Sequence, residues 1–125
     1  MTPDQIDLAR RLVASPKWKW VPGMGVRRWS DYYVLWRTNR VSNLAERGTF
    51  WLAEGWLPDL NDPATLGCLL QLVREAWSDP EAHIALGAAG WVLMSGESRV
   101  ADVVYPSPAG TTEAEALVAA LEAAP

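Results

Sequence analysis

Apolar residues between positions 6 and 13 recur at the spacing of one helix face. Thr2 and Gln5 form a Thr-x-x-Gln capping box just before this stripe. Pro3 stands at the first helical position, where its missing N–H leaves no hydrogen bond unmade. The Ser-Pro pair at 15–16 is a stop signal, because the residue before a proline disfavours helical geometry. The pattern therefore predicts a first helix that begins after Thr2 and ends near Ser15.

Strand-like patterns dominate the next part of the chain. Residues 17–21, Lys-Trp-Lys-Trp-Val, alternate strictly, residues 26–37 end in Tyr-Tyr-Val-Leu-Trp-Arg, and residues 49–53 read Thr-Phe-Trp-Leu-Ala. Runs that are rich in aromatic and β-branched residues and have a period of two predict strands. The polar stretch 38–47 between the second and third runs is interpreted as a connection.

The clearest helical pattern follows at residues 62–78. Asp62 is a typical N-cap, and Pro63 occupies the first helical position. The apolar residues Leu66, Leu69, Leu70, Val73 and Trp77 then line one broad face. The Asp-Pro pair at 79–80 ends the segment, so a second helix is predicted here.

The last third of the chain predicts short strands and one more helix. Apolar stretches at 83–86, 91–94 and 99–105 are separated by turns rich in Gly, Ala and Ser, which indicates two or three strands. Thr112 and Glu115 form a second capping box before an apolar stripe, so the last helix begins at Thr111 or Thr112.

Together these elements predict an α+β fold with the order α-β-β-β-α-β-β-α. Turns of hairpin length favour antiparallel pairing, and about three amphipathic helices need a sheet on which to bury their stripes. We therefore expect one antiparallel sheet packed with helices in a layered α/β/α sandwich. The length of 125 residues predicts a single domain, 1–125.

The C-terminal part of the sequence carries a recognisable layout. A capped helix ends in Leu-Val-Arg-Glu-Ala-Trp, a Gly-Trp-Val strand and a further strand follow, and a loop leads into Thr-Glu-Ala-Glu-Ala-Leu-Val-Ala-Ala-Leu. With Leu-Pro-Asp-Leu-Asn-Asp-Pro before the helix, residues 57–125 resemble small phage proteins with the phage ABA sandwich domain. The resemblance implies a layered α/β/α fold and a phage origin, and it implies no catalytic residues. The N-terminal half departs from that short domain.

Charge and tryptophan are both distributed unusually. Residues 1–47 carry nine Lys/Arg and four Asp/Glu, a net +5, whereas residues 48–125 carry two and eleven, a net −9. Such asymmetry marks either a surface for nucleic acid or a partner, or two halves that pack together and neutralise each other. The chain also holds eight tryptophans, more than a core of this size needs, so we expect one or two to be exposed for binding.

The strongest candidate for binding is the basic and aromatic stretch between residues 17 and 37. Its members are Lys17, Trp18, Lys19, Trp20, Arg27, Arg28, Trp29, Tyr32, Trp36 and Arg37, with Tyr33 among them. Aromatic rings stack on bases while cations contact phosphates, so this composition is typical of a nucleic-acid surface, and it is equally typical of a protein-binding hot spot. The third alternative is an amphipathic sheet with aromatics inside and cations outside. The net charge of −4 disfavours general affinity for DNA.

The sequence offers little for catalysis or metal binding. His83 is the only histidine and Cys68 the only cysteine, so no Ser-His-Asp triad motif or zinc ligand set is found. Gly23-Met24-Gly25 lacks the third glycine of a phosphate-binding loop. We therefore expect no cofactor, no metal and no enzymatic activity, with Cys68 and His83 in structural roles.

Location and partners follow from the same observations. No apolar run reaches the roughly 20 residues that a membrane span needs, and a single cysteine fits a reducing compartment, here the cytoplasm of a bacterial host. The leading hypothesis is a phage-encoded accessory protein that binds a host macromolecule, with an anti-CRISPR-like inhibitor of antiviral defence as its concrete form. The alternative is a nucleic-acid or nucleotide binder that uses residues 17–37. An enzyme of unrecognised type is a third hypothesis, and homo-oligomerisation is compatible with each.

Overall fold

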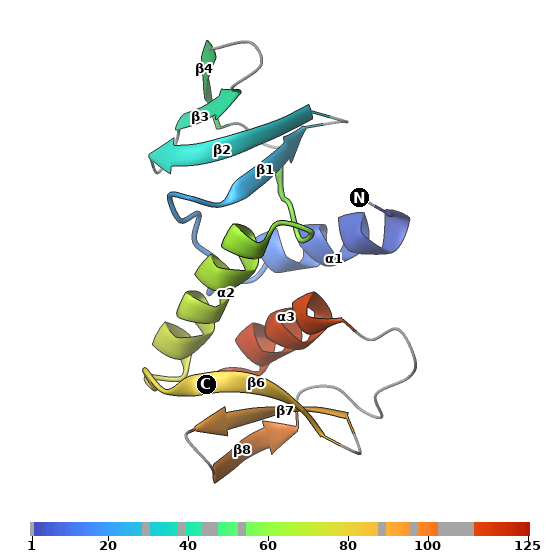
Figure 1. Ribbon diagram of the computed structural model, residues 1–125, viewed down its shortest axis with the longest axis vertical. Coiled ribbons are helices and arrows are strands. Elements are labelled where there is room, and N and C mark those ends of the chain that lie inside the picture. The colour runs from blue at the N-terminus through green and yellow to red at the C-terminus, as the bar shows by residue number, and fades with distance from the viewer. Residues whose placement is uncertain are drawn as a thin grey trace. The chain divides into compact units, whose positions relative to one another are not determined.

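The structure is a computed structural model that describes residues 2–28, 31–37, 40–43, 48–52, 55–87, 90–95, 98–102 and 112–125 (Figure 1). Its contacts divide the chain into two compact units, unit 1 (Met1–Cys68) and unit 2 (Leu69–Pro125). Each unit has its own helices and its own antiparallel sheet.

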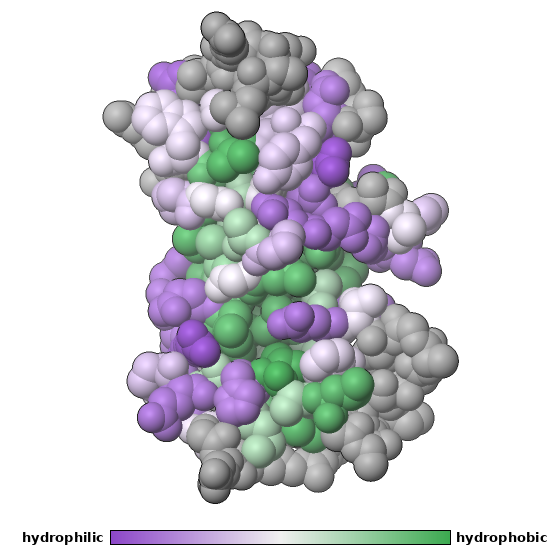
Figure 2. All heavy atoms as spheres, in the orientation of Figure 1, coloured by the Kyte–Doolittle hydropathy of each residue, from purple (hydrophilic) through white to green (hydrophobic). Residues whose placement is uncertain are grey.

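Unit 1 begins with helix α1, Pro3–Val13, as the sequence predicts. The capping box is complete: the Thr2 hydroxyl accepts from the backbone N–H of Gln5, and the Gln5 side chain accepts from the backbone N–H of Thr2. Leu8, Ala9 and Leu12 form the buried face. Asp4, Asp7, Arg10 and Arg11 are exposed on the rest of the helix, and Figure 2 shows hydrophilic residues gathered near its N-terminal end, which is the pattern of a helix that covers a core with one face.

A five-stranded antiparallel sheet forms the rest of unit 1. Its strands are β1 (Gly25–Arg28), β2 (Asp31–Arg37), β3 (Arg40–Asn43), β4 (Gly48–Trp51) and β5 (Leu57–Pro58), in the spatial order β4-β3-β2-β1-β5. The inner face of the sheet carries a hydrophobic cluster of buried residues, made of Val26, Tyr33, Leu35, Val41 and Trp56. The Tyr33 and Trp56 rings pack with their centroids 4.8 Å apart.

Three of the predicted boundaries in this part are wrong. Residues 17–21 form no strand, because Trp18 and Trp20 pack edge to face with centroids 5.3 Å apart and Trp20 packs on the inner cluster instead. The run 26–37 is two strands, β1 and β2, which pair as a hairpin. The polar stretch 38–47 contains β3, whose Val41 contributes to the core although its neighbours are polar.

Helix α2, Pro63–Ala76, begins in unit 1 and ends in unit 2. Asp62 caps it as predicted, since its Oδ1 accepts from the backbone N–H of Ala64 at 3.2 Å. Leu69, Leu72 and Val73 are its most deeply buried apolar residues.

Unit 2 continues with a three-stranded antiparallel sheet and a last helix. The strands β6 (Ala82–Gly87), β7 (Gly90–Ser95) and β8 (Ser98–Asp102) lie in sequence order, and α3 spans Glu113–Ala123. Thr112 caps α3, because its hydroxyl accepts from the backbone N–H of Glu115. The Trp77 indole donates to the carbonyl of Ala120 at 2.8 Å and so ties α3 to the end of α2.

The α+β class and the succession of helix, strands, helix, strands and helix are confirmed. The expectation of one sheet in the α/β/α sandwich is wrong, because the strands divide into sheets of five and three. The single domain 1–125 stays a prediction. None of the helices in the described part of the chain is both long and apolar enough to cross a membrane.

Candidate functional site

The side of the five-stranded sheet opposite the hydrophobic cluster carries the candidate site. Antiparallel register places Arg27 opposite Tyr32 and Val34 opposite Ser42, and neighbours in a strand point to opposite faces. We call the resulting surface the outer face, and it consists of Arg27, Tyr32, Val34, Trp36, Arg40 and Ser42. Tyr33, Leu35 and Val41 fill the inner face. Because side chains alternate along β2, its remaining side chains lie on the outer face.

Two aromatic side chains stand out from this face. Tyr32 is 40% exposed and Trp36 is 46% exposed, and Leu86 of unit 2 is the third large hydrophobic side chain exposed in the described part of the chain. A β-bulge lies at Trp36, between the cross-strand pairs Leu35–Val41 and Arg37–Arg40. Bulges bend a strand and change the direction of a side chain at the edge of its ladder. Trp36 therefore lies at an irregular position of the β2–β3 ladder.

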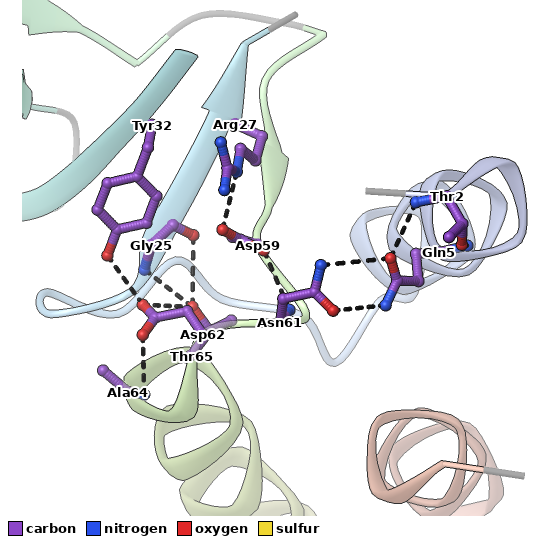
Figure 3. A network of polar contacts seen from close by, with 10 residues as sticks. All are labelled: Thr2, Gln5, Gly25, Arg27, Tyr32, Asp59, Asn61, Asp62, Ala64 and Thr65. Atoms are coloured by element: carbon purple, nitrogen blue, oxygen red, sulfur yellow. Dashed lines mark hydrogen bonds and ion pairs between the residues drawn. The ribbon is translucent and has the colours of Figure 1, made fainter. Parts of the chain in front are cut away.

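Tyr32 is exposed and yet firmly held (Figure 3). Its hydroxyl donates to Oδ2 of Asp62 at 3.1 Å, and the Arg27 guanidinium lies 5.3 Å from the centroid of its ring. A cation at that distance from an aromatic face is attracted by the ring quadrupole. Burial raises the pKa of Tyr32, and so do the charge of Asp62 and its hydrogen bond. The phenol consequently stays protonated and keeps its bond to Asp62 well beyond neutral pH.

Arg27 is held by a buried carboxylate. Its Nε donates to Oδ2 of Asp59 at 2.8 Å, and Asp59 is only 2% exposed. The other oxygen of Asp59 accepts from the backbone N–H of Asn61 at 3.0 Å. The side chains of Asn61 and Gln5 then exchange hydrogen bonds of 2.6 and 3.3 Å, so the network reaches α1.

Gly25 and Thr65 close the network on the side of α2. The backbone N–H of Gly25 donates to the buried hydroxyl of Thr65 at 2.8 Å, and that hydroxyl lies 3.2 Å from Oδ2 of Asp62. The carbonyl of Gly25 accepts from the backbone N–H of Asp59 at 2.8 Å. A Cβ on Gly25 would lie 2.5 Å from Asp62 Oδ2, so the close approach requires glycine. The ring of contacts therefore fixes Tyr32 to both β1 and α2.

The structure brings together only part of the predicted binding stretch. Arg27, Tyr32 and Trp36 share the outer face, whereas the Arg28 guanidinium lies 5.2 Å from the Trp56 ring centroid on the inner face. The remaining members lie elsewhere: Lys17, Trp18, Lys19 and Trp20 precede the sheet, Trp29 lies outside the described residues, and Arg37 ends β2 with a side chain outside them. The expectation that a tryptophan is exposed is confirmed for Trp36.

Sequence reasoning missed Asp59, Thr65 and Arg40. Asp59 and Thr65 are the buried polar residues of the described part of the chain. Their partners, Arg27 and Gly25, lie 32 and 40 residues away, so no local pattern could pair them. Arg40 lies on β3, a strand whose polar sequence gave no signal.

Cys68 and His83 lie in different units. Cys68 lies in α2, as predicted, and burial, together with the charge of Asp62, raises the pKa of its thiol. His83 lies on β6 with Nδ1 3.1 Å from the carbonyl oxygen of Glu81. No group of three or more potential metal ligands is found within the described ranges.

No protein-family model, curated protein or solved structure matches this chain. The resemblance of residues 57–125 to the phage ABA sandwich domain therefore stays a prediction.

Proposed function

We propose that the protein acts by binding a partner protein through the outer face of its five-stranded sheet. The observation that supports this most is the exposure of Tyr32 and Trp36, 40% and 46%, from one face of one strand. Tyrosine, tryptophan and arginine are the residues most enriched at binding hot spots, because each supplies a large contact area. The outer face offers all three types within β1 and β2.

The fixed position of Tyr32 favours binding further. Association normally costs about 0.5–1.5 kcal/mol for each flexible side chain that becomes immobilised. The Tyr32 ring is already held by Arg27 and its hydroxyl by Asp62. Little of that ordering cost then remains at Tyr32, and the aromatic area that a partner buries contributes more fully to affinity.

Nucleic-acid binding is the second candidate, and exposed aromatics beside arginines favour it. The charges nearby favour it less. Unit 1 carries nine Lys/Arg and seven Asp/Glu, a net charge of +2, and Arg27 forms an ion pair with Asp59. The carboxylate of Asp62, 3.1 Å from the Tyr32 hydroxyl, would repel a phosphate placed beside that ring. A protein partner fits the face better.

Residues 57–125 resemble a phage domain, and the chain has 125 residues and no recognised catalytic motif. We accordingly propose a phage-encoded accessory protein whose partner belongs to the bacterial host, with a component of antiviral defence, as for anti-CRISPR proteins, as the concrete target.

Affinity capture with matched variants tests the proposal. Full-length protein, Trp36→Ala and Leu86→Ala are used as baits in a bacterial lysate, and the captured proteins are quantified by mass spectrometry. Leu86, on β6, is 62% exposed, so its variant controls for non-specific apolar contact. We expect a stoichiometric protein that Leu86→Ala retains and Trp36→Ala loses. Equal capture by all three baits would contradict the proposal.

A titration with labelled single- and double-stranded oligonucleotides separates the second candidate. Binding that weakens steeply with salt and disappears in Trp36→Ala would show that the outer face binds nucleic acid rather than a protein. We expect no binding at low salt that depends on Trp36.

A further inference from the structure

Strand β6 forms one edge of the three-stranded sheet of unit 2 (Figure 1). Its residues, Ala82–Gly87, include no proline, lysine, arginine or acidic residue, and its pairing with β7 runs without a register shift. The opposite edge, β8, has Arg99 and Asp102 in its sequence, and its ladder with β7 contains a register shift. Charges, prolines and bulges keep sheet edges from pairing with other chains, so β6 lacks a protection that β8 has.

The hairpin register decides which backbone groups of β6 face the edge. A two-residue connection joins β6 to β7, so Gly87 and Gly90 form a hydrogen-bonded pair. Hydrogen-bonded and non-hydrogen-bonded pairs alternate along an antiparallel ladder. The backbone N–H and C=O groups of Ala82, Ile84 and Leu86 therefore point away from β7.

The contacts of Ala82 agree with this register. Its N–H donates to the carbonyl of Asp79 at 3.2 Å, and its carbonyl accepts from Nε of Arg74 at 2.8 Å, so both groups are satisfied within the chain. Among the described residues, no hydrogen-bond partner is found on this side for the backbone of Ile84 or Leu86. The open part of the edge thus consists of these two residues, which offer two donors and two acceptors.

The side chains at the open part of the edge are apolar. Leu86 is 62% exposed, the largest value among the exposed large hydrophobic side chains of the described residues. Ile84, which is partly exposed, lies two residues earlier on the same face of the sheet. Unpaired backbone groups beside apolar side chains are the two components of strand addition, in which the backbone supplies hydrogen bonds and the side chains supply contact area.

An antiparallel second copy of β6 matches this edge completely. With a two-fold axis at Ala85, Ile84 lies opposite the partner's Leu86, and Leu86 lies opposite the partner's Ile84. Each of these pairs exchanges two hydrogen bonds, so all the free groups of both copies are satisfied. The same pairing covers each exposed leucine with an isoleucine, and neither strand brings a lysine, arginine or acidic residue that would repel its copy.

We propose that β6 pairs with β6 of a second copy of this chain, antiparallel about Ala85, and so joins two three-stranded sheets into one. A two-fold contact of this kind closes after two copies. The contact is small beside the roughly 1,200–2,000 Å² that stable interfaces bury, so we expect a weak dimer that forms as concentration rises. The proposal concerns unit 2 and does not depend on the proposed function of the outer face.

Engineered cysteines test the register on the full-length chain. In Ala85→Cys the two cysteines face each other across the axis with Cα atoms about 4.5 Å apart, within the range that disulfides span. His83→Cys is the matched control on the same face of β6, because its two copies would lie four residues apart, about 13 Å. With a mild oxidant we expect a covalent dimer from Ala85→Cys, and from His83→Cys only the background that the wild type gives through Cys68.

Sedimentation from micromolar to millimolar concentration measures the association itself. Leu86→Lys changes an exposed side chain and should weaken the dimer by about tenfold or more, because it replaces an apolar contact with a charge. Gln71→Lys adds the same charge at an exposed position of α2 and should have no effect. Amide exchange of Ile84 and Leu86 should slow as concentration rises, whereas that of Ala82, already bonded within the chain, should not change.

Each contrary outcome overturns the proposal in a distinct way. A chain that stays monomeric at millimolar concentration would exclude the dimer, and association that Leu86→Lys leaves intact would place the contact away from β6. Equal cross-linking of Ala85→Cys and His83→Cys would refute the register. Slow exchange of Ile84 and Leu86 at every concentration would show that the edge is covered within one chain, and growth beyond two copies would refute the two-fold pairing.

Discussion

The buried carboxylate of Asp59 allows the polar network to be tested with one change. Its Oδ2 accepts from Nε of Arg27 at 2.8 Å, and its Oδ1 accepts from the backbone N–H of Asn61 at 3.0 Å. In Asp59→Asn one of these oxygens becomes an NH2 group. Because both neighbours are donors, the amide can satisfy only one of them, whichever way it is turned.

The expected loss of stability follows from the burial of each partner. An unsatisfied buried polar group costs about 1–3 kcal/mol, and breaking a fully buried ion pair costs about 3–5 kcal/mol. Asp59 is buried, but the Arg27 side chain is 30% exposed, so water can compensate its guanidinium. We therefore expect Asp59→Asn to lower the free energy of unfolding by about 2 kcal/mol.

Urea unfolding followed by tryptophan fluorescence measures this loss. Asp31→Asn is the control, because Asp31 lies exposed at the start of β2 and its change should stay within about 0.5 kcal/mol. The double variant Asp59→Asn with Arg27→Met should lose less than the sum of the single variants. A loss below about 0.5 kcal/mol for Asp59→Asn, or strict additivity, would refute the reasoning.

Three further predictions concern single sites. Gly25→Ala should destabilise by about 1–3 kcal/mol in urea unfolding, since its Cβ meets the carboxylate that caps α2, whereas Gly67→Ala, with open space around it, should stabilise by about 0.5–1 kcal/mol; equal effects would refute the close approach. Cys68 should react with a thiol reagent at pH 8 several-fold more slowly than in urea-unfolded protein, because burial raises its pKa; equal rates would contradict this. Asp79 has a lowered pKa, chiefly from a hydrogen bond with Ser95, so its stabilisation is present above pH 3.8 and lost as pH falls through the lower value. Asp79→Asn should therefore make the free energy of unfolding fall less steeply as pH is lowered below 3.8. An unchanged pH dependence would exclude a stabilising role for the Asp79 carboxylate.

The helices were predictable because their signals are local. Thr2, Asp62 and Thr112 each precede a helix and accept a hydrogen bond from its first turn. The capping residue alone therefore indicates where each helix begins. The strands were less predictable, because a period of two does not say which strands pair. Residues 17–21 show the failure most clearly: the alternation is perfect, yet these residues form no strand, and Trp20 packs on the hydrophobic cluster.

The candidate site was predictable in composition but not in geometry. The sequence indicates that aromatics and cations are concentrated near Tyr32 and Trp36, and the structure exposes both rings. The acidic partners could not be foreseen, because Asp59 reaches Arg27 only through the pairing of β1 with β5. Pairing of that kind depends on the whole sheet rather than on any short segment.

The boundary between the two units falls inside α2, between Cys68 and Leu69. A fragment that stops at Cys68 would keep only residues 63–68 of this helix, below the roughly 12 residues at which isolated helices become even marginally stable. Its last carbonyl groups would lose their hydrogen-bond donors. Truncations, gene fusions and split-protein reporters should therefore leave Pro63–Ala76 intact and place their junctions outside it.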